Sequence, residues 1–241
     1  MGPKPMFIAD GHHRYETACN YRDELQAEGQ LAPGNPANGV LMMCVGMNDP
    51  GLIVQPTHRL FRGVPDLTAE ELCEKLQTCF TTRIAGEGID LAEPIWDEIE
   101  KENHQGTIGL FTTQDERWTV VRINEAGRAR MKELVPDHSS DWRDLGVSIL
   151  HRLIIDELLN AAGHPKPGYV HSVEKFMRGI EENSEPGGAG EVAEPYRLGA
   201  LVMPASLEHI RTISEHGERM PAKSTYFYPK LLAGMVIHSH R

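Results

Sequence analysis

The sequence has few cysteines and no long apolar run. Its four cysteines form no Cys-x-x-Cys pair and have no zinc-ribbon spacing, which argues against a zinc ribbon and against a disulfide-rich secreted domain. We therefore expect a reduced, cytoplasmic protein with buried thiols. No apolar stretch approaches the ~18 residues of a membrane span, and residues 1–5 lack the apolar run of a signal peptide.

Positive charge is also scarce. The chain has 24 Lys and Arg against 35 Asp and Glu, a formal net charge of -11. A surface of that sign repels the phosphate backbone of nucleic acids unless basic residues gather locally, so nucleic-acid binding is disfavoured. The hydrophobic fraction of 40% is close to the globular average and is enough for one large core or two small ones.

Apolar periodicity and turn residues predict an α+β fold. Helices are expected over 12–28, 68–80, 89–103, 145–159, from 172 and over 206–215, and residues 183–195 predict a surface loop. Thr68 with Glu71 three residues on predicts a capping box for the 68–80 helix, whose inner stripe is Leu72, Leu76 and Phe80. Strands are expected over 6–9, 40–47, 52–54, 107–113, 118–123, near 169, and over 198–203, 223–228 and 235–238.

The strands over 107–113 and 118–123 flank a polar turn and predict a hairpin. Because hairpin-like neighbours occur among these alternating elements, a mixed β-sheet with flanking helices is favoured over a doubly wound parallel sheet. We expect a strand-turn-helix phosphate-binding region at 1–64, followed by a remaining α+β region at 65–241 that packs as one continuous unit.

The strongest signal for chemistry is Asp10-Gly11-His12-His13-Arg14, between an expected strand and an expected helix. A glycine lets the backbone approach a ligand, and free N–H groups at a helix start attract anions. The two imidazoles and the guanidinium can donate to phosphate oxygens, and Asp10 can hold a cation or orient a hydroxyl. The structural alternative is that Asp10 caps the helix and Arg14 pairs with a nearby acid.

This motif lies within Ile8-Ala9-Asp10-Gly11-His12-His13-Arg14-Tyr15-Glu16-Thr17-Ala18, which resembles the hallmark of the domain of unknown function 1015 family, sometimes labelled ParB-like. The resemblance continues through residues 49–52, 56–60, 150–154 and 217–230, and so covers nearly the whole chain. Longer members carry the motif near their middle. The chain thus resembles their second half alone, which implies that any catalytic carboxylate of the first half is missing.

More distantly, the turn resembles the phosphate-contacting Gly-x-x-Arg turn of the ParB and sulfiredoxin superfamily, which includes free-serine kinases. That resemblance implies that Gly11, His12, His13 and Arg14 contact nucleotide phosphates and that Asp10 lies beside the transfer site. The nucleophilic cysteine of sulfiredoxins is absent from this turn, so sulfinic-acid reduction is not implied.

Two further segments carry residues suited to phosphate. His58 and Arg59 follow an expected strand, where they either reach the same rim or form a strand-end turn with a solvated arginine. Residues 217–224 have the length of a Walker A motif, but a helix precedes them, alanine replaces the glycine before the lysine, and a strand follows. This loop is therefore either an anion clamp or a basic surface loop, with Arg219, Lys223, Ser224 and Thr225 as its polar residues.

Twelve histidines raise the question of a metal site. The adjacent His12 and His13 would diverge on a helix or strand and so would rarely bind one ion. Mg2+ held by Asp10 and phosphate oxygens is therefore favoured over structural zinc.

Together these residues predict binding of a nucleotide and a small-molecule substrate, with phosphoryl transfer from ATP or ADP, assisted by Mg2+, to a small hydroxyl metabolite such as serine. Asp10 and His12 are the candidate catalytic residues. The candidate phosphate ligands are Gly11, His13, Arg14, His58, Arg59, Arg219, Lys223, Ser224 and Thr225. The alternatives are a ParB-like nucleotide-binding switch without turnover, and a metal-dependent phosphatase that uses Asp10, Asp49 and histidines. No membrane partner is expected, and the oligomeric state is left open.

Overall fold

The computed structural model describes residues 5–183, 194–230, 232 and 234–240, so most of the predicted loop 183–195 lies outside the described residues. The chain divides into two units, one of residues 1–53 with 227–241 and one of residues 54–226. The division predicted at residue 64 separates a phosphate-binding function from the rest and stays a prediction.

The larger unit is built on a six-stranded sheet with the order β3-β5-β4-β7-β2-β6. Its neighbouring strands are all antiparallel, and the predicted hairpin is confirmed as β4 and β5. With helices on the sheet, the predicted α+β class is confirmed. The strands are β2 (His58–Phe61), β3 (Phe80–Glu87), β4 (Thr107–Thr112), β5 (Arg117–Ile123), β6 (Gly168–Val170) and β7 (Leu198–Val202).

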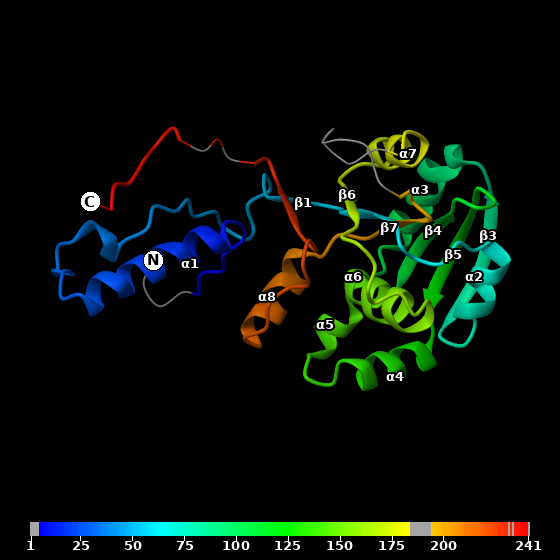
Figure 1. Ribbon diagram of the computed structural model, residues 1–241, viewed down its shortest axis with the longest axis horizontal. Coiled ribbons are helices and arrows are strands. Elements are labelled where there is room, and N and C mark those ends of the chain that lie inside the picture. The colour runs from blue at the N-terminus through cyan, green and yellow to red at the C-terminus, as the bar shows by residue number, and fades with distance from the viewer. Residues whose placement is uncertain (1–4, 184–193, 231, 233, 241) are drawn as a thin grey trace. The chain divides into compact units, whose positions relative to one another are not determined.

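Helices cover both faces of this sheet (Figure 1). One face carries α3 (Ala92–Glu102) and α7 (Val173–Glu181). The other carries α2 (Ala69–Leu76), α4 (Glu125–Leu134), α6 (Gly146–Ser148) and a π-helix, η3 (Ile149–Leu158). Two further helices, α5 (Ser140–Asp144) and α8 (Leu207–Glu215), complete the unit, and η2 (Ile89–Leu91) leads into α3.

Two apolar cores follow from the alternation of side chains along each strand. In β2, for example, Leu60 packs into the core under α3 and α7, whereas Phe61 packs into the core under α2, α4 and η3. In β4, Phe111 packs into the core under α3 and α7, and Leu110 packs into the core under α2, α4 and η3. The inner strands are therefore apolar on both faces.

Helix starts lie where the sequence supplies caps. Thr68 Oγ1 accepts the N–H of Glu71 at 3.2 Å, and Glu71 Oε2 accepts the N–H of Thr68 at 2.9 Å, which confirms the capping box expected for α2. Ser172 and Ser206 cap α7 and α8 in the same position.

The smaller unit contains α1 (His12–Ala27), in agreement with the expected helix, and a short 3-10 helix, η1 (Pro36–Asn38). No described side chain of α1 is buried. Two short strands, β1 (Ile53–Gln55) and β8 (Tyr226–Tyr228), pair with each other at the residues where the chain leaves and re-enters this unit.

Three predicted strands are wrong. Residues 6–9, 40–47 and 235–238 form no strand, and Met43 and Ile237 in them are 62% and 81% exposed. A strand needs a neighbour to satisfy its N–H and C=O groups, and none of the described strands pairs with these segments. An apolar run indicates a tendency to be buried but does not supply the neighbouring strand.

His58 and Arg59 do not form the strand-end turn with a solvated arginine that was one of the two alternatives for this segment. It is β2, an inner strand between β7 and β6 that is buried along its whole length. Burial of the thiols is confirmed for Cys79, whereas Cys44 is exposed, and all four cysteines are free. Across the described residues, no helix is both long enough and apolar enough to span a bilayer.

Candidate functional site

The Asp10-Gly11-His12-His13-Arg14 motif lies at the start of α1, in the smaller unit. Gly11 is the N-cap residue, with φ 84° and ψ 26° in the left-handed region that favours glycine. The N–H of Tyr15 donates to Gly11 O at 3.0 Å, the first helical bond of α1. The preceding N–H groups of the helix start have no helical acceptor, and no described side chain caps them. This end of α1 therefore offers backbone donors to an anion.

Asp10 is held beside this helix start by two contacts. Its Oδ1 accepts the N–H of Gly11 at 3.0 Å, and its Oδ2 lies 3.3 Å from Lys230 Nζ. Partial burial alone would raise the pKa of the carboxyl, but the hydrogen bond and charge of Lys230, followed by Gly11 N–H and Arg14, outweigh it and lower the pKa. Asp10 is therefore ionised at neutral pH, and Gly11 rather than Asp10 caps the helix.

The side chain of Arg14 folds back over Gly11. A Cβ atom added to Gly11 would lie 2.9 Å from Arg14 Nη2 and 3.1 Å from its Nε, so glycine supplies both the backbone angle and the space for the guanidinium. Arg14 also lines a hollow of about 410 Å³ together with Thr17, Ala18, Tyr21, Ser239 and His240. A cationic group thus lies next to the open helix end.

The two histidines of the motif are exposed to solvent. His13 Nδ1 lies 3.5 Å from Glu16 Oε2, and its side chain remains fully accessible. Neither imidazole is fixed by packing, so both can turn toward a ligand at the helix start.

In the larger unit, Arg59 is a buried cation, only 1% exposed. Its Nη1 donates to Thr57 O, its Nη2 donates to Lys223 O at 2.8 Å, and its Nε has no partner among the described residues. Burial lowers the pKa of Arg59 to about 10, which still leaves the guanidinium charged at pH 7. No carboxylate of the described chain pairs with it, so carbonyl oxygens and the Tyr169 ring at 5.9 Å are its compensation.

The neighbouring His58 is neutral. Burial first, then the charge of Arg59 and the nearby His171, lower the pKa of His58 to about 3. Its Nδ1 accepts the N–H of Val202 at 3.3 Å, and its ring meets the ring of Trp96 edge-on at 4.7 Å. His58 is thus packed into the core under α3 and α7.

The loop from 219 to 225 meets β2 through its main chain. Lys223, exposed and at φ 56°, is the residue whose carbonyl accepts from Arg59. Ser224 is 3% exposed, and its hydroxyl has no partner among the described residues. Arg219 is exposed and Thr225 half-buried, and Arg219 O accepts from Trp142 Nε1 at 3.1 Å.

Sequence reasoning missed an aromatic pair beside β2. His171 and Tyr226 stack at 3.7 Å, and His171 Nδ1 lies 3.3 Å from Thr57 Oγ1 and 3.1 Å from Pro56 O. Tyr226 belongs to the 217–230 segment that carries the family resemblance. That resemblance was the sequence feature that could have drawn attention to Tyr226. His171 had none, because it follows β6 and is brought to Pro56 and Thr57 by the pairing of β6 with β2, which lies far from it in the sequence.

The predicted site residues therefore form two groups. Asp10, Gly11, His12, His13 and Arg14 lie with Lys230 in the smaller unit, and His58, Arg59, Arg219, Lys223, Ser224 and Thr225 lie in the larger unit. Within the described ranges, no three or more His, Cys, Asp or Glu side chains are arranged to hold a metal ion.

The family model described as "Protein of unknown function (DUF1015)" matches residues 1–148, more than half of the chain. The chain belongs to the DUF1015 family. The part that matches the DUF1015 model contains the start of α1 and all of β2, whereas the 219–225 loop lies beyond it.

Solved structures similar to this DUF1015 chain include a mutant free serine kinase in complex with AMP. The TM-score is 0.45 at 14% identity, over 94% of this chain and 69% of that one. Another is a conserved hypothetical protein from Pyrococcus furiosus, with a TM-score of 0.41 at 15% identity, over 91% of this chain and 68% of that one. No curated protein matches the chain.

Proposed function

We propose that this DUF1015 chain binds the phosphate group of a nucleotide at the start of α1 and transfers a phosphoryl group from ATP or ADP to a small hydroxyl metabolite. The observation that carries the proposal is the left-handed Gly11 at an uncapped helix start, with the Arg14 guanidinium folded over its α-carbon. Backbone donors and a cation at one point favour the binding of an oxyanion.

Binding would use the backbone first and the side chains second. The first N–H groups of α1 point out of the helix end, and the partial positive charge of the helix adds to that of Arg14. His12 and His13 are exposed on the same turn, so they can donate to the outer phosphate oxygens. The hollow of about 410 Å³ beside Arg14 gives room for the remainder of a bound molecule.

The chemistry would depend on placement and charge, as in other phosphoryl transfers. Asp10, ionised at neutral pH, would orient the acceptor hydroxyl and take up its proton, and His12, the first residue of α1, would assist. Lys230, 3.3 Å from Asp10, would help to neutralise the charge on the transferring group. Mg2+ would take Asp10 as its protein ligand and phosphate oxygens and water as its others.

The 219–225 loop is a second proposed phosphate contact, through Arg219, Lys223, Ser224 and Thr225. Arg59 is part of this proposed contact, because its Nη2 donates to the carbonyl of Lys223 at 2.8 Å. It is buried, so it would reach a phosphate only after this loop moves away. His58 is buried on the opposite face of β2, against Trp96, so it would contact a phosphate only if the core under α3 and α7 opened.

The decisive experiment combines nucleotide binding with a search for product. Full-length protein is incubated with labelled ATP or ADP, Mg2+ and a panel of hydroxyl-bearing amino acids. A phosphorylated small product supports the transferase, whereas nucleotide binding without product supports a switch. Phosphate release that depends on stoichiometric bound metal would instead indicate the phosphatase.

Arg14→Ala tests the binding site itself. Loss of a charge-assisted bond to phosphate should weaken nucleotide binding by roughly 1.5–3 kcal/mol. Arg22→Ala is the matched control, since Arg22 lies on the same helix and pairs with Asp23 at 2.6 Å. Titration calorimetry should find a loss of nucleotide affinity for Arg14→Ala alone. Equal nucleotide affinities of the two variants would show that Arg14 does not bind the phosphate.

A further inference from the structure

A cleft of about 540 Å³ in the larger unit contains none of the residues used above. It is open to solvent and is lined by the loop between α3 and β4, by α4, by α5, by the end of β7 and by the start of α8. Its polar side chains include His104, Gln105, Arg128, Asp144, Ser206 and His209. The hydrogen bonds around it determine which way its donors face.

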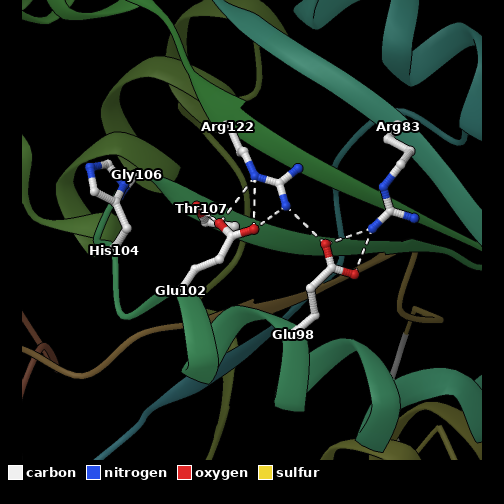
Figure 2. Close-up of polar contacts among 7 residues, drawn as sticks. All are labelled: Arg83, Glu98, Glu102, His104, Gly106, Thr107 and Arg122. Carbon is white, nitrogen blue, oxygen red and sulfur yellow. Dashed lines mark hydrogen bonds and ion pairs between the residues drawn. The ribbon is translucent and has the colours of Figure 1, made fainter.

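The first donor is His104, which follows α3 at the end of a chain of ion pairs between α3, β3 and β5 (Figure 2). His104 Nδ1 accepts the N–H of Gly106 at 3.1 Å, so this nitrogen carries no proton. The proton of the neutral ring must then be on Nε2. His104 therefore presents an N–H donor at Nε2.

The same reasoning applies to His209 in the first turn of α8. Its Nδ1 accepts the N–H of Ser206 at 3.1 Å, as the side chain at this position does in a capping box. Burial is the main cause of a lowered pKa for His209, which keeps the ring neutral at pH 7. His209 Nε2 is therefore a second N–H donor, with no partner among the described residues.

Arg128 is the third donor, and its arrangement with His104 is unusual. Its Nη1 pairs with Asp144 Oδ1, while its Nη2 lies 3.5 Å from His104 Nε2. Both of these nitrogens are donors, so the contact cannot be a hydrogen bond between them. An oxygen placed between the two would accept from both.

The walls of the cleft are held in place. Gln105 Nε2 donates to Pro204 O at 2.7 Å, and Gln105 Oε1 accepts the N–H of Gly146 at 3.0 Å. This side chain ties the loop after α3 to the end of β7 and to the start of α6. The backbone of the loop that carries His104 is therefore held in place before any ligand arrives.

We propose that this cleft binds a small zwitterionic carboxylate of the amino-acid type. Its carboxylate oxygens accept from His104 Nε2, Arg128 Nη2 and His209 Nε2, and its cationic group faces Asp144. Asp144 Oδ2 makes no hydrogen bond among the described residues, and the side chain is 55% exposed. The site is thus built for both charges of the ligand.

The surrounding charges favour a carboxylate over a phosphate. Asp141, Glu208 and Asp144 all act on His209 through their negative charge. Arg128, the one arginine among the described residues that line the cleft, already pairs with Asp144. A singly charged group with a cation beside it is accommodated here, whereas a doubly charged phosphate is repelled.

The test uses the full chain and ¹⁵N spectra of the imidazole rings. We expect L-alanine to shift the Nε2 signals of His104 and His209 saturably, acetate to bind about tenfold more weakly because it lacks the ammonium group, and inorganic phosphate to bind more weakly than L-alanine. Tighter binding of phosphate than of L-alanine, or no saturable shift with L-alanine, would overturn the proposal.

Two variants separate the roles of the cleft residues. His104→Asn keeps an acceptor for Gly106 N–H but removes the Nε2 donor, and should weaken L-alanine binding about tenfold. Asp144→Asn should weaken L-alanine binding but not acetate binding. The control is His216→Asn, an exposed histidine just after α8. Unchanged L-alanine affinity in His104→Asn, or equal effects of Asp144→Asn on both probes, would contradict the assignment. Nucleotide binding by Arg14 takes no part in any of these readouts.

Discussion

Gly11 meets two requirements at once. Its backbone lies at φ 84°, and the guanidinium of Arg14 occupies the space where a Cβ would be. Gly29, after the other end of α1, has the similar φ of 72°, but no atom of the described residues lies within 4 Å of its missing Cβ. The two glycines therefore separate backbone strain from displacement of Arg14.

Gly11→Ala and Gly29→Ala should each lower the free energy of unfolding by about 1 kcal/mol, because an L residue is strained at these angles. Gly11→Ala alone should also weaken nucleotide binding, since its methyl group displaces Arg14. Urea denaturation and calorimetric titration of both variants measure the two effects. Equal nucleotide affinities would show that the position of Arg14 over Gly11 has no role in binding.

His58 makes stability depend on pH. Its pKa falls from 6.5 to about 3 on folding because burial disfavours the charged ring. Above pH 6.5 the ring is neutral in both states. Between pH 6.5 and 3 the unfolded chain binds a proton that the folded chain does not, so this contribution to stability is lost as the pH falls.

The free energy of unfolding should therefore decrease on acidification below pH 6.5, with His58 contributing up to about 1.4 kcal/mol per pH unit. His58→Gln should reduce this slope, since glutamine does not titrate. His216→Asn, which removes an exposed histidine, should leave it unchanged. Urea denaturation at several pH values gives the slopes, and parallel curves for His58→Gln and the unmutated protein would contradict the buried, neutral state of His58.

At the scale of single elements, the sequence predicted the structure well where an element depends only on residues close together in the chain. The α2 capping box depends on residues three apart, and the β4–β5 hairpin on two neighbouring runs. Phe80 illustrates the limit: its spacing continues the apolar stripe of α2, yet it begins β3, where it pairs with Ile123 of β5. A pairing with a strand that far along the chain overrides local periodicity.

The α2 capping box provides a test at this scale. Thr68→Ala removes the acceptor for Glu71 N–H and should destabilise the larger unit by about 1 kcal/mol. Thr78→Ala is the control, because Thr78 is exposed just after the same helix and its hydroxyl makes no hydrogen bond among the described residues. Urea denaturation followed by circular dichroism should find a loss for Thr68→Ala only. Equal stabilities would mean that this helix start is held by packing alone.

At the scale of the whole molecule, the sheet order was beyond local reasoning. β7 lies between β4 and β2, and Gly109 and Leu60 pair with it from far along the chain. The burial of Arg59 was not predictable for the same reason: the sequence left it as a phosphate ligand at the rim or a solvated turn residue, and the strands that bury it come from residues 168–170 and 198–202. In the candidate site, the helix start at Gly11 was predictable, since its donors are local to the motif. The contact of Arg59 with Lys223 was not.

The two units should also differ in local stability. No described side chain of α1 is buried, whereas β4 and β7 are buried throughout. Amides of α1 should therefore exchange with solvent through low-energy local opening, and those of β4 and β7 only at energies close to global unfolding. Native-state hydrogen exchange followed by NMR measures both, and equally slow exchange in α1 would contradict this difference.

The same exchange experiment, repeated with nucleotide present, tests where the nucleotide binds. A ligand that requires the folded start of α1 adds RT ln(1 + [L]/Kd) to the opening energy of that helix, about 2.7 kcal/mol at a hundredfold excess over Kd. ADP with Mg2+ should therefore slow exchange in α1 of the unmutated protein clearly more than in α1 of Arg14→Ala. If ADP slowed exchange in β4 and β7 while α1 stayed unchanged, the nucleotide would be bound in the larger unit. The start of α1 would then have the geometry of an anion-binding site but would not bind the nucleotide.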